Sequence, residues 1–338
     1  MATSRISWID IARGIGIILV LQGHALSAHV YRHFIYAFHM PLFFFISGLL
    51  FDYKKYSFLE NLKKSARGIL VPYVIFAGVS YLIWMFNNSF SASPEQIMLH
   101  LIGVFYGNSS SLFFNLVLWF LPCLFITKML FALITTFIKK DKVLIVVLFI
   151  FSLLGYFAFI YLPDLNLPFG IESALTAVVF FGAGSILRTN YAKNIDFKIN
   201  KRSIAILIAS LVILIISTQI NYEIYGRQID IRLNNLGNYF LFYTGAVSGI
   251  ILTVLIAKII NKNMILEKIG EYALPLFVFH PFVFAYLNPI MVGLFGVEFF
   301  RQWKDLLLAP FYTAVAIIVI FLGVYFYQQL IKKIKAKN

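Results

Sequence analysis

The stretch Asp10-Ile-Ala-Arg13-Gly-Ile-Gly-Ile-Ile-Leu-Val-Leu-Gln-Gly-His24 has the apolar run of a membrane-spanning helix but carries three ionisable side chains. Such side chains are costly in lipid, so they usually face a protein interior or a water-filled cavity and mark a function. His24 follows Arg13 by eleven positions, which in an α-helix is three turns plus about 20° and a rise of about 16 Å. Arg13 and His24 are therefore predicted to share one helix face, with Asp10 placed to pair with Arg13.

The remaining sequence is equally apolar, since 61% of the 338 residues are hydrophobic and only 12% are charged, with a mean hydropathy of +0.87. Soluble domains are about half apolar and a quarter charged, so the composition indicates an all-α polytopic membrane protein. Windows of about 17–25 apolar residues predict ten transmembrane helices. They lie near residues 6–27, 34–51, 69–87, 112–137, 143–161, 170–187, 203–220, 238–257, 272–295 and 308–331.

Lysine and arginine alternate between the predicted loops. They gather in the loops near 54–67, 139–142, 188–202 and 258–268 and in the tail at 332–337, whereas the opposite loops hold only Arg32, Arg227, Arg232, Arg301 and Lys304. Because cytoplasmic loops collect Lys and Arg, both termini are predicted to be cytoplasmic. The net charge of +14 then reflects topology and anionic lipid, and we expect no nucleic-acid partner.

The loops are too short for a separate folded unit, so residues 1–338 are predicted to form a single transmembrane domain. The first span is followed by no cleavage pattern and is expected to remain in the mature chain. The single cysteine, Cys123, lies in the fourth span and allows no intramolecular disulfide. Cysteine, histidine and carboxylate residues show no metal-ligand spacing, so we expect no metal site.

A second ionisable residue enters with the next span. In Phe38-His39-Met40-Pro41-Leu42-Phe43-Phe44-Phe45-Ile46-Ser47-Gly48, the imidazole of His39 precedes an aromatic run and a Ser-Gly step. The connecting loop is short, so the first two helices are predicted to be antiparallel neighbours. His24 and His39 could then share a pocket that opens to the outer face.

On the inner side, Lys63-Lys64-Ser65-Ala66-Arg67 precedes the third span. The simplest interpretation is a solvated positive-inside cluster. The functional interpretation is that Lys64 and Arg67, three residues apart, bind the phosphates of a cytoplasmic nucleotide-like donor together with Arg13. The sequence alone leaves both interpretations open.

At these residues the sequence resembles the acyltransferase-3 family of membrane acyltransferases, and in particular its fucose 4-O-acetylase and capsule O-acetyltransferase branch. The resemblance rests on Trp8-Ile9-Asp10 with the Arg13–His24 spacing, on the 38–48 motif, and on Trp119-Phe120-Leu121-Pro122. One departure is that Lys64 stands where the family motif often has an arginine, which weakens the case for bidentate phosphate binding there.

The resemblance implies acyl transfer, commonly of acetyl, from cytoplasmic acyl-CoA to a hydroxyl of a surface polysaccharide or its lipid-linked precursor. Acetyl-CoA is the expected donor substrate, and no tightly bound cofactor is expected. A bacterial plasma membrane is the implied location, and the chain could form a homo-oligomer. A base with a pKa near neutrality suits removal of the hydroxyl proton, so His24 is the expected general base, although a covalent acyl-histidine is also possible.

The other candidate site residues have supporting roles. Asp10 is expected to orient Arg13, and Arg13 to contact the donor. The expected substrate contacts are His39, Ser47, Lys64, Arg67, Trp119, Glu172 and His280. For His280, in the ninth span, and Glu172, at the outer start of the sixth, a structural hydrogen bond is an equally good interpretation.

Two alternatives come from other functional classes. A transporter or flippase of a lipid-linked sugar or small anion could use Asp10, Arg13 and His24 as a proton relay. Many such transporters show matching broken helices in two repeats, and no such repeat is evident in this sequence. The third interpretation is a catalytically silent scaffold for a polysaccharide synthase. If it holds, surface acylation should remain intact in cells that express the His24→Ala variant.

Overall fold

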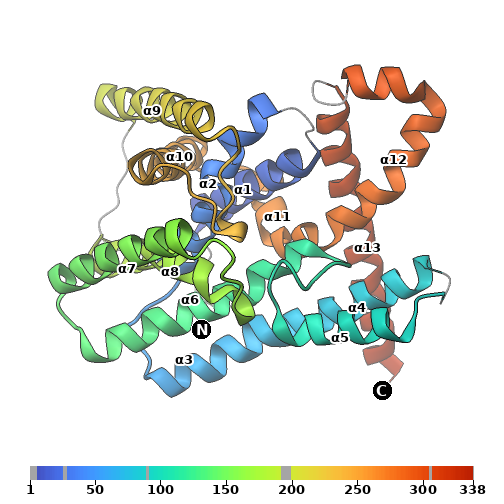
Figure 1. Ribbon diagram of the computed structural model, residues 1–338, viewed down its shortest axis with the longest axis horizontal. Helices are drawn as coiled ribbons and strands as arrows, with labels where there is room; N and C mark the ends of the chain where they lie inside the picture. Colours follow the sequence, from blue (N-terminus) through green and yellow to red (C-terminus); the bar gives the residue numbers. More distant parts are fainter. Residues whose placement is uncertain (1–5, 26–28, 89–90, 192–198, 304–306, 338) are drawn as a thin grey trace.

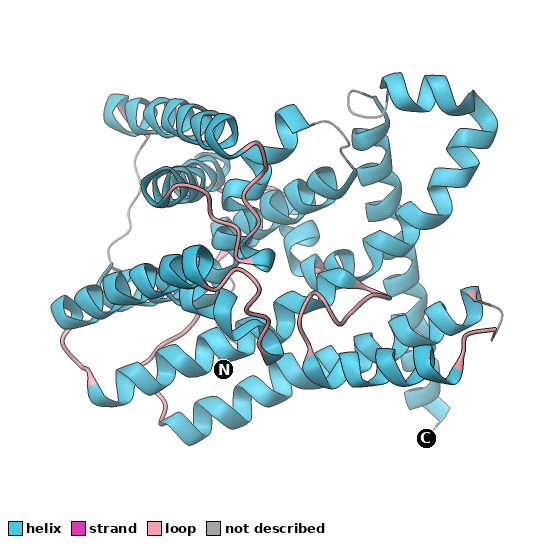
Figure 2. Ribbon diagram, in the orientation of Figure 1, coloured by secondary structure: helices cyan, strands magenta, loops and turns pink. Residues whose placement is uncertain are grey.

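The computed structural model describes residues 6–25, 29–88, 91–191, 199–303 and 307–337. Over these residues the chain consists of helices and connecting loops and contains no β-strand (Figure 2). The predicted all-α class is therefore confirmed.

The first half of the chain contains both long helices and short helical turns. The order is α1 (Ser7–Ala25), α2 (His29–Leu49), α3 (Phe58–Ser65), the π-turn η1 (Ala66–Leu70), α4 (Val71–Asn87), α5 (Pro94–Tyr106), the 3-10 turn η2 (Leu116–Trp119), α6 (Phe120–Phe137) and α7 (Asp141–Tyr161).

The second half continues in the same way. It contains η3 (Pro168–Gly170), α8 (Ile171–Tyr191), α9 (Lys201–Tyr225), η4 (Ile231–Leu233), α10 (Tyr239–Ile260), α11 (Met264–Glu271), α12 (Ala273–Trp303) and α13 (Ala309–Lys337).

Every predicted span overlaps one of these helices. Within the described residues, 8 helices are long and apolar enough to cross a membrane. α1 and α2 are not among these, because α1 holds Asp10, Arg13 and His24 and α2 holds three histidines and an arginine. The predicted total of ten spans therefore stays a prediction.

α1 and α2 lie at the centre of the bundle (Figure 1). α1 packs against α2, α10, α11, α12 and α13, and α2 also packs against α8, α9 and α10. The large apolar side chains of α7, α9 and α13 instead point outward in many places. Surrounding helices thus separate the charged face of α1 from lipid, which removes most of the cost of placing ions there.

The N-terminal half of α1 is held closely by α11. A Cβ atom added to Gly14 would overlap the carbonyl oxygen of Leu266, and one added to Gly270 would overlap that of Asp10. Small residues permit such close approach of helix backbones. The Ser7 hydroxyl strengthens the contact by donating to Glu267 Oε1 over 2.6 Å.

Three features differ from the predicted loops. α5 and α11 occupy segments that were expected to be irregular, and the segment expected to be a loop up to Arg67 becomes helical at Phe58. The helix widens into the π-turn η1 just before Pro72. Proline has no N–H and its ring collides with the carbonyl four residues earlier, which explains the local widening.

The orientation of the bundle can be tested with α9, whose two ends are predicted to lie on opposite sides of the membrane. The single native cysteine, Cys123, is buried, so background labelling should be low. In intact cells, an impermeant maleimide is expected to label Arg227→Cys, and to label Lys201→Cys only after lysis. Strong labelling of Lys201→Cys in intact cells would contradict cytoplasmic termini.

Candidate functional site

A cavity of about 170 Å³ lies where α1, α2, η2, α12 and the loop before α10 meet. Its lining combines imidazoles, guanidinium groups, one carboxylate and aromatic rings. The residues are His24, Arg32, Tyr36, His39, Met40, Leu116, Val117, Trp119, Asp230, Ile231, Arg232 and Phe277. Three predicted site residues, His24, His39 and Trp119, therefore share one cavity.

The imidazole of His24 is the accessible one, because its side chain is exposed whereas that of His39 is 4% exposed. Tyr36 stands between them, with its ring centroid 6.1 Å from that of His24 and 4.8 Å from that of His39. His39 was expected near the start of its span, but α2 begins at His29, so His39 lies in mid-helix.

His280 is the third imidazole of this cluster. Its ring centroid lies 4.9 Å from that of His24, and its side chain is completely buried. It is not one of the lining residues of the cavity, so it contacts His24 from behind. The structure thus joins His280, from α12, to the face of α1 that the sequence singled out.

Backbone carbonyls fix the tautomers of two of the imidazoles. His39 Nδ1 lies 2.8 Å from the Ile35 carbonyl oxygen, and His280 Nδ1 lies 3.1 Å from that of Leu276. A carbonyl can only accept, so each Nδ1 must donate and each neutral ring keeps a lone pair on Nε2. His280 Nε2 is buried and has no hydrogen-bond partner among the described residues.

The aromatic wall of the cavity comes from η2. Asn115, just before η2, donates from Nδ2 to the Ser80 hydroxyl and to the Val278 carbonyl, both over 3.0 Å. These bonds attach η2 to α4 and to α12 close to His280. Trp119, which ends η2, is 5% exposed and faces the cavity in the fixed position that this anchoring provides.

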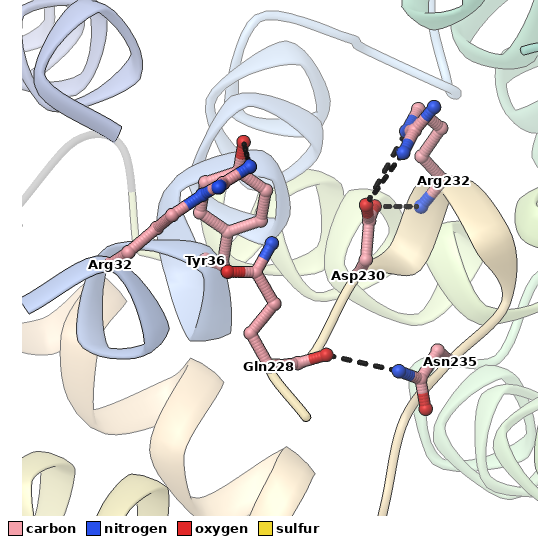
Figure 3. A network of polar contacts seen from close by, with 6 residues as sticks. All are labelled: Arg32, Tyr36, Gln228, Asp230, Arg232 and Asn235. Carbon is pink, nitrogen blue, oxygen red and sulfur yellow. Dashed lines mark hydrogen bonds and ion pairs between the residues drawn. The ribbon is translucent and has the colours of Figure 1, made fainter. Parts of the chain in front are cut away.

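The opposite wall is the loop between α9 and α10 (Figure 3). Asp230 and Asn235 exchange two backbone hydrogen bonds of 2.8 and 2.9 Å, and Asn235 Nδ2 donates to the Gln228 carbonyl over 3.0 Å. Within this closed loop Asp230 Oδ2 pairs with Arg232 Nη2 at 3.1 Å. The loop therefore holds one carboxylate and one guanidinium at the cavity in fixed positions.

Sequence reasoning missed four polar residues of the cavity. Arg32 and Tyr36 precede His39 by seven and three positions on α2, so a helical stripe at i, i+4 and i+7 would have revealed them. Asp230 and Arg232 come from a loop that reaches the cavity only in the folded chain, and no local pattern indicates them.

Asp10 and Arg13 form the predicted ion pair, with a distance of 3.1 Å between Asp10 Oδ1 and Arg13 Nη1. Neither residue lines the cavity around His24. Since α1 is continuous between Arg13 and His24, their separation along the axis is about 16 Å. The helix thus carries two separate polar regions, one near each end.

Lys64 and Arg67, which were predicted to bind the phosphates of the donor, lie on α3 and η1. The Lys64 ammonium nitrogen lies 3.0 Å from the centroid of the Tyr56 ring, and hydrogen bonds from Lys64 and Lys55 lower the pKa of the Tyr56 hydroxyl. Arg67 is exposed but belongs to the π-turn, so the expected helical spacing from Lys64 is interrupted. Both side chains are exposed, and Lys64 is the one that lies over the Tyr56 ring.

Two further predicted contacts lie outside the cavity. Glu172 is 5% exposed and accepts the backbone N–H of Leu167 over 3.1 Å at the start of α8. This contact matches the structural hydrogen bond that was considered as an alternative to substrate binding. Ser47 is half-buried near the C-terminal end of α2. Among the residues that the structure describes, no group of three or more His, Cys, Asp or Glu side chains could hold a metal ion.

Comparison with known proteins gives one match. The model of the acyltransferase domain of the acyltransferase-3 family covers residues 6–325, which is nearly the whole chain. A search of curated proteins and a search of solved structures found no match. Because the family model spans α1 to α13, including every element that lines the cavity, this chain belongs to the acyltransferase-3 family of membrane acyltransferases.

Proposed function

We propose that this acyltransferase is an O-acetyltransferase of the fucose 4-O-acetylase type. It moves an acetyl group from cytoplasmic acetyl-CoA to a hydroxyl of a cell-surface polysaccharide or its lipid-linked precursor, in a bacterial plasma membrane. The observation that carries the proposal is the exposed imidazole of His24 in a cavity, with a second, buried imidazole directly behind it. Family membership favours this chemistry over the transporter and scaffold alternatives.

In this mechanism a sugar hydroxyl enters the cavity and His24 accepts its proton as the oxygen attacks the thioester carbonyl carbon. The new C–O bond forms, the C–S bond breaks, and the proton passes to the departing thiolate to give free CoA. General-base catalysis of this kind typically contributes about 10²–10⁴-fold in rate. A covalent acetyl-His24 would use the same residues in two steps.

His280 acts as a positioning residue. When His24 has accepted the proton, its imidazolium needs a hydrogen-bond acceptor. The ring of His280 lies 4.9 Å away between centroids, and its buried Nε2 has no hydrogen-bond partner among the described residues. The Leu276 carbonyl keeps the His280 proton on Nδ1, so the lone pair on Nε2 remains available. An unsatisfied buried nitrogen is costly, and this task would explain why the fold contains one.

The donor end of the pathway is assigned to Arg13, supported by Arg67 and Lys64. Arg13 is one-third exposed and keeps donor capacity beyond its single bond to Asp10. A CoA bound by its phosphates at this end would have to extend its thioester about 16 Å along α1 to reach His24. The long pantetheine arm of CoA suits that separation.

The test is acetyl transfer by the full-length protein in proteoliposomes, with mass spectrometry of surface polysaccharide from cells with and without the gene. An acetyl mass increment that depends on the gene is expected. Arg13→Ala is expected to raise the KM for acetyl-CoA about tenfold, because one charge-assisted hydrogen bond to the donor is lost. Arg13→Lys is expected to keep part of the activity. Unchanged surface polysaccharide in cells lacking the gene would contradict the proposed function.

A further inference from the structure

The cavity contains two guanidinium groups, and only one of them has a carboxylate partner. Arg232 is neutralised by Asp230, which accepts from Nη2 at 3.1 Å, from Nε at 3.4 Å and from the Arg232 backbone N–H at 3.0 Å. Both carboxylate oxygens of Asp230 therefore accept hydrogen bonds from Arg232. Among the described residues, Asp230 is also the only carboxylate that lines the cavity.

Arg32 is the second cation. Its Nη2 donates to the Tyr36 hydroxyl at 3.3 Å, and its guanidinium carbon lies 5.0 Å from the centroid of the Tyr36 ring. Its Nε is buried and has no hydrogen-bond partner in the part of the chain that the structure describes. Among the described residues no carboxylate lies within ion-pair distance of Arg32, and Figure 3 shows its side chain extended along Tyr36, apart from the Asp230–Arg232 pair.

The cavity therefore carries one positive charge more than negative charge when its histidines are neutral. A half-buried guanidinium with an unused N–H gains most from a bound oxyanion, since guanidinium pairs with carboxylate or phosphate through strong charge-assisted hydrogen bonds. The aromatic face of Tyr36 stabilises the cation, and the Tyr36 hydroxyl accepts from Nη2, but neither contact neutralises the positive charge of Arg32. The site has the composition of an anion subsite beside the candidate base.

We propose that the acceptor carries an oxyanion, a sugar carboxylate or a phosphate, next to the hydroxyl that is acylated, and that Arg32 binds this anion. This inference rests on the proposed function and names the acceptor class. The cavity of about 170 Å³ is smaller than the roughly 300–1,000 Å³ of a typical ligand pocket. It would thus hold the reacting hydroxyl and its anionic neighbour, while the rest of the acceptor stays outside.

The first test locates the acetyl group in polysaccharide from cells that express the protein. Mass spectrometry and NMR are expected to place it on a sugar that bears a carboxylate or phosphate, or on the residue linked directly to one. The nature of that anion distinguishes the two sources. Acetylation of a neutral sugar with no anionic neighbour would overturn the inference and leave the proposed function intact, whereas absence of any gene-dependent acetyl group would contradict the function itself.

The second test uses methyl glucuronide, methyl glucoside 6-phosphate and methyl glucoside as competitors of acetyl transfer to the polysaccharide in membranes. At least one anionic glycoside is expected to inhibit the parent at about tenfold lower concentration than the neutral one, and Arg32→Gln should remove that difference. The matched control is Arg227→Gln, an exposed arginine near the start of the same loop that does not line the cavity. It is expected to behave as the parent.

Kinetics of the Arg32→Gln variant separate acceptor binding from other roles. The KM for the polysaccharide acceptor is expected to rise about tenfold, with the KM for acetyl-CoA unchanged. A higher KM for acetyl-CoA would assign the cation to the donor. A lower kcat with unchanged acceptor KM would assign it to the transition state. Either result, or equal inhibition of the parent by the three glycosides, would overturn the inference.

Discussion

Replacing His24 by alanine is expected to lower the turnover of acetyl transfer by about 10²–10⁴-fold without changing expression or the affinity for acetyl-CoA. The imidazole is exposed at the cavity, so its removal is expected to disturb the packing of the bundle little. Its role as base is exercised only as the hydroxyl attacks, and loss of an interaction confined to the transition state lowers kcat. Steady-state kinetics in proteoliposomes, with labelled acetyl-CoA binding measured in parallel, check both parts.

The matched control is His100→Ala. His100 is a histidine of α5 that contacts Trp84 edge to face, with 4.2 Å between ring centroids, and does not line the cavity. This variant is expected to retain most of the parental turnover. Parental turnover in His24→Ala would remove His24 from the chemistry and make His39, the other cavity imidazole, the next candidate base.

Much of the helical framework could be predicted from the sequence, because length and apolar composition set membrane helices. The short helix α5 was taken for part of a loop, since its 13 residues cannot cross a bilayer. Its start was nevertheless readable, because Ser93 and Gln96 form a capping box before the apolar run. α11 likewise begins after an Asn263 cap, in a loop that was considered only for its charge.

The candidate site was predictable where a helix face or a sequence motif marks its residues, as for His24, His39 and Trp119. The Arg13–His24 spacing and the position of His39 led to the cavity, because the spacing of residues along a helix determines which side chains share a face. The contact between His280 and His24 depends on how α12 crosses α1, and the position of Asp230 depends on a loop closed by Asn235. Such tertiary contacts have no local sequence pattern, so they required the structure.

The expected consequence of His280→Ala is a 10–100-fold lower kcat with little change in either KM, the size of effect seen when a group that orients a reacting residue is lost. His280 is completely buried, so alanine would also leave a void and could act through packing. Two further substitutions separate these causes. His280→Phe restores the aromatic volume without a hydrogen-bond acceptor, whereas His280→Gln restores an acceptor near the position of Nε2.

If His280 orients His24 through its Nε2 lone pair, His280→Gln should retain most of the turnover and His280→Phe should be as slow as His280→Ala. A packing role predicts the reverse order. The double variant His24→Ala/His280→Ala provides the decisive measurement, because residues that act as a unit are not additive. It is expected to be no slower than His24→Ala alone. A further loss of kcat in the double variant would mean that His280 acts on the substrate directly and not through the 4.9 Å contact with His24.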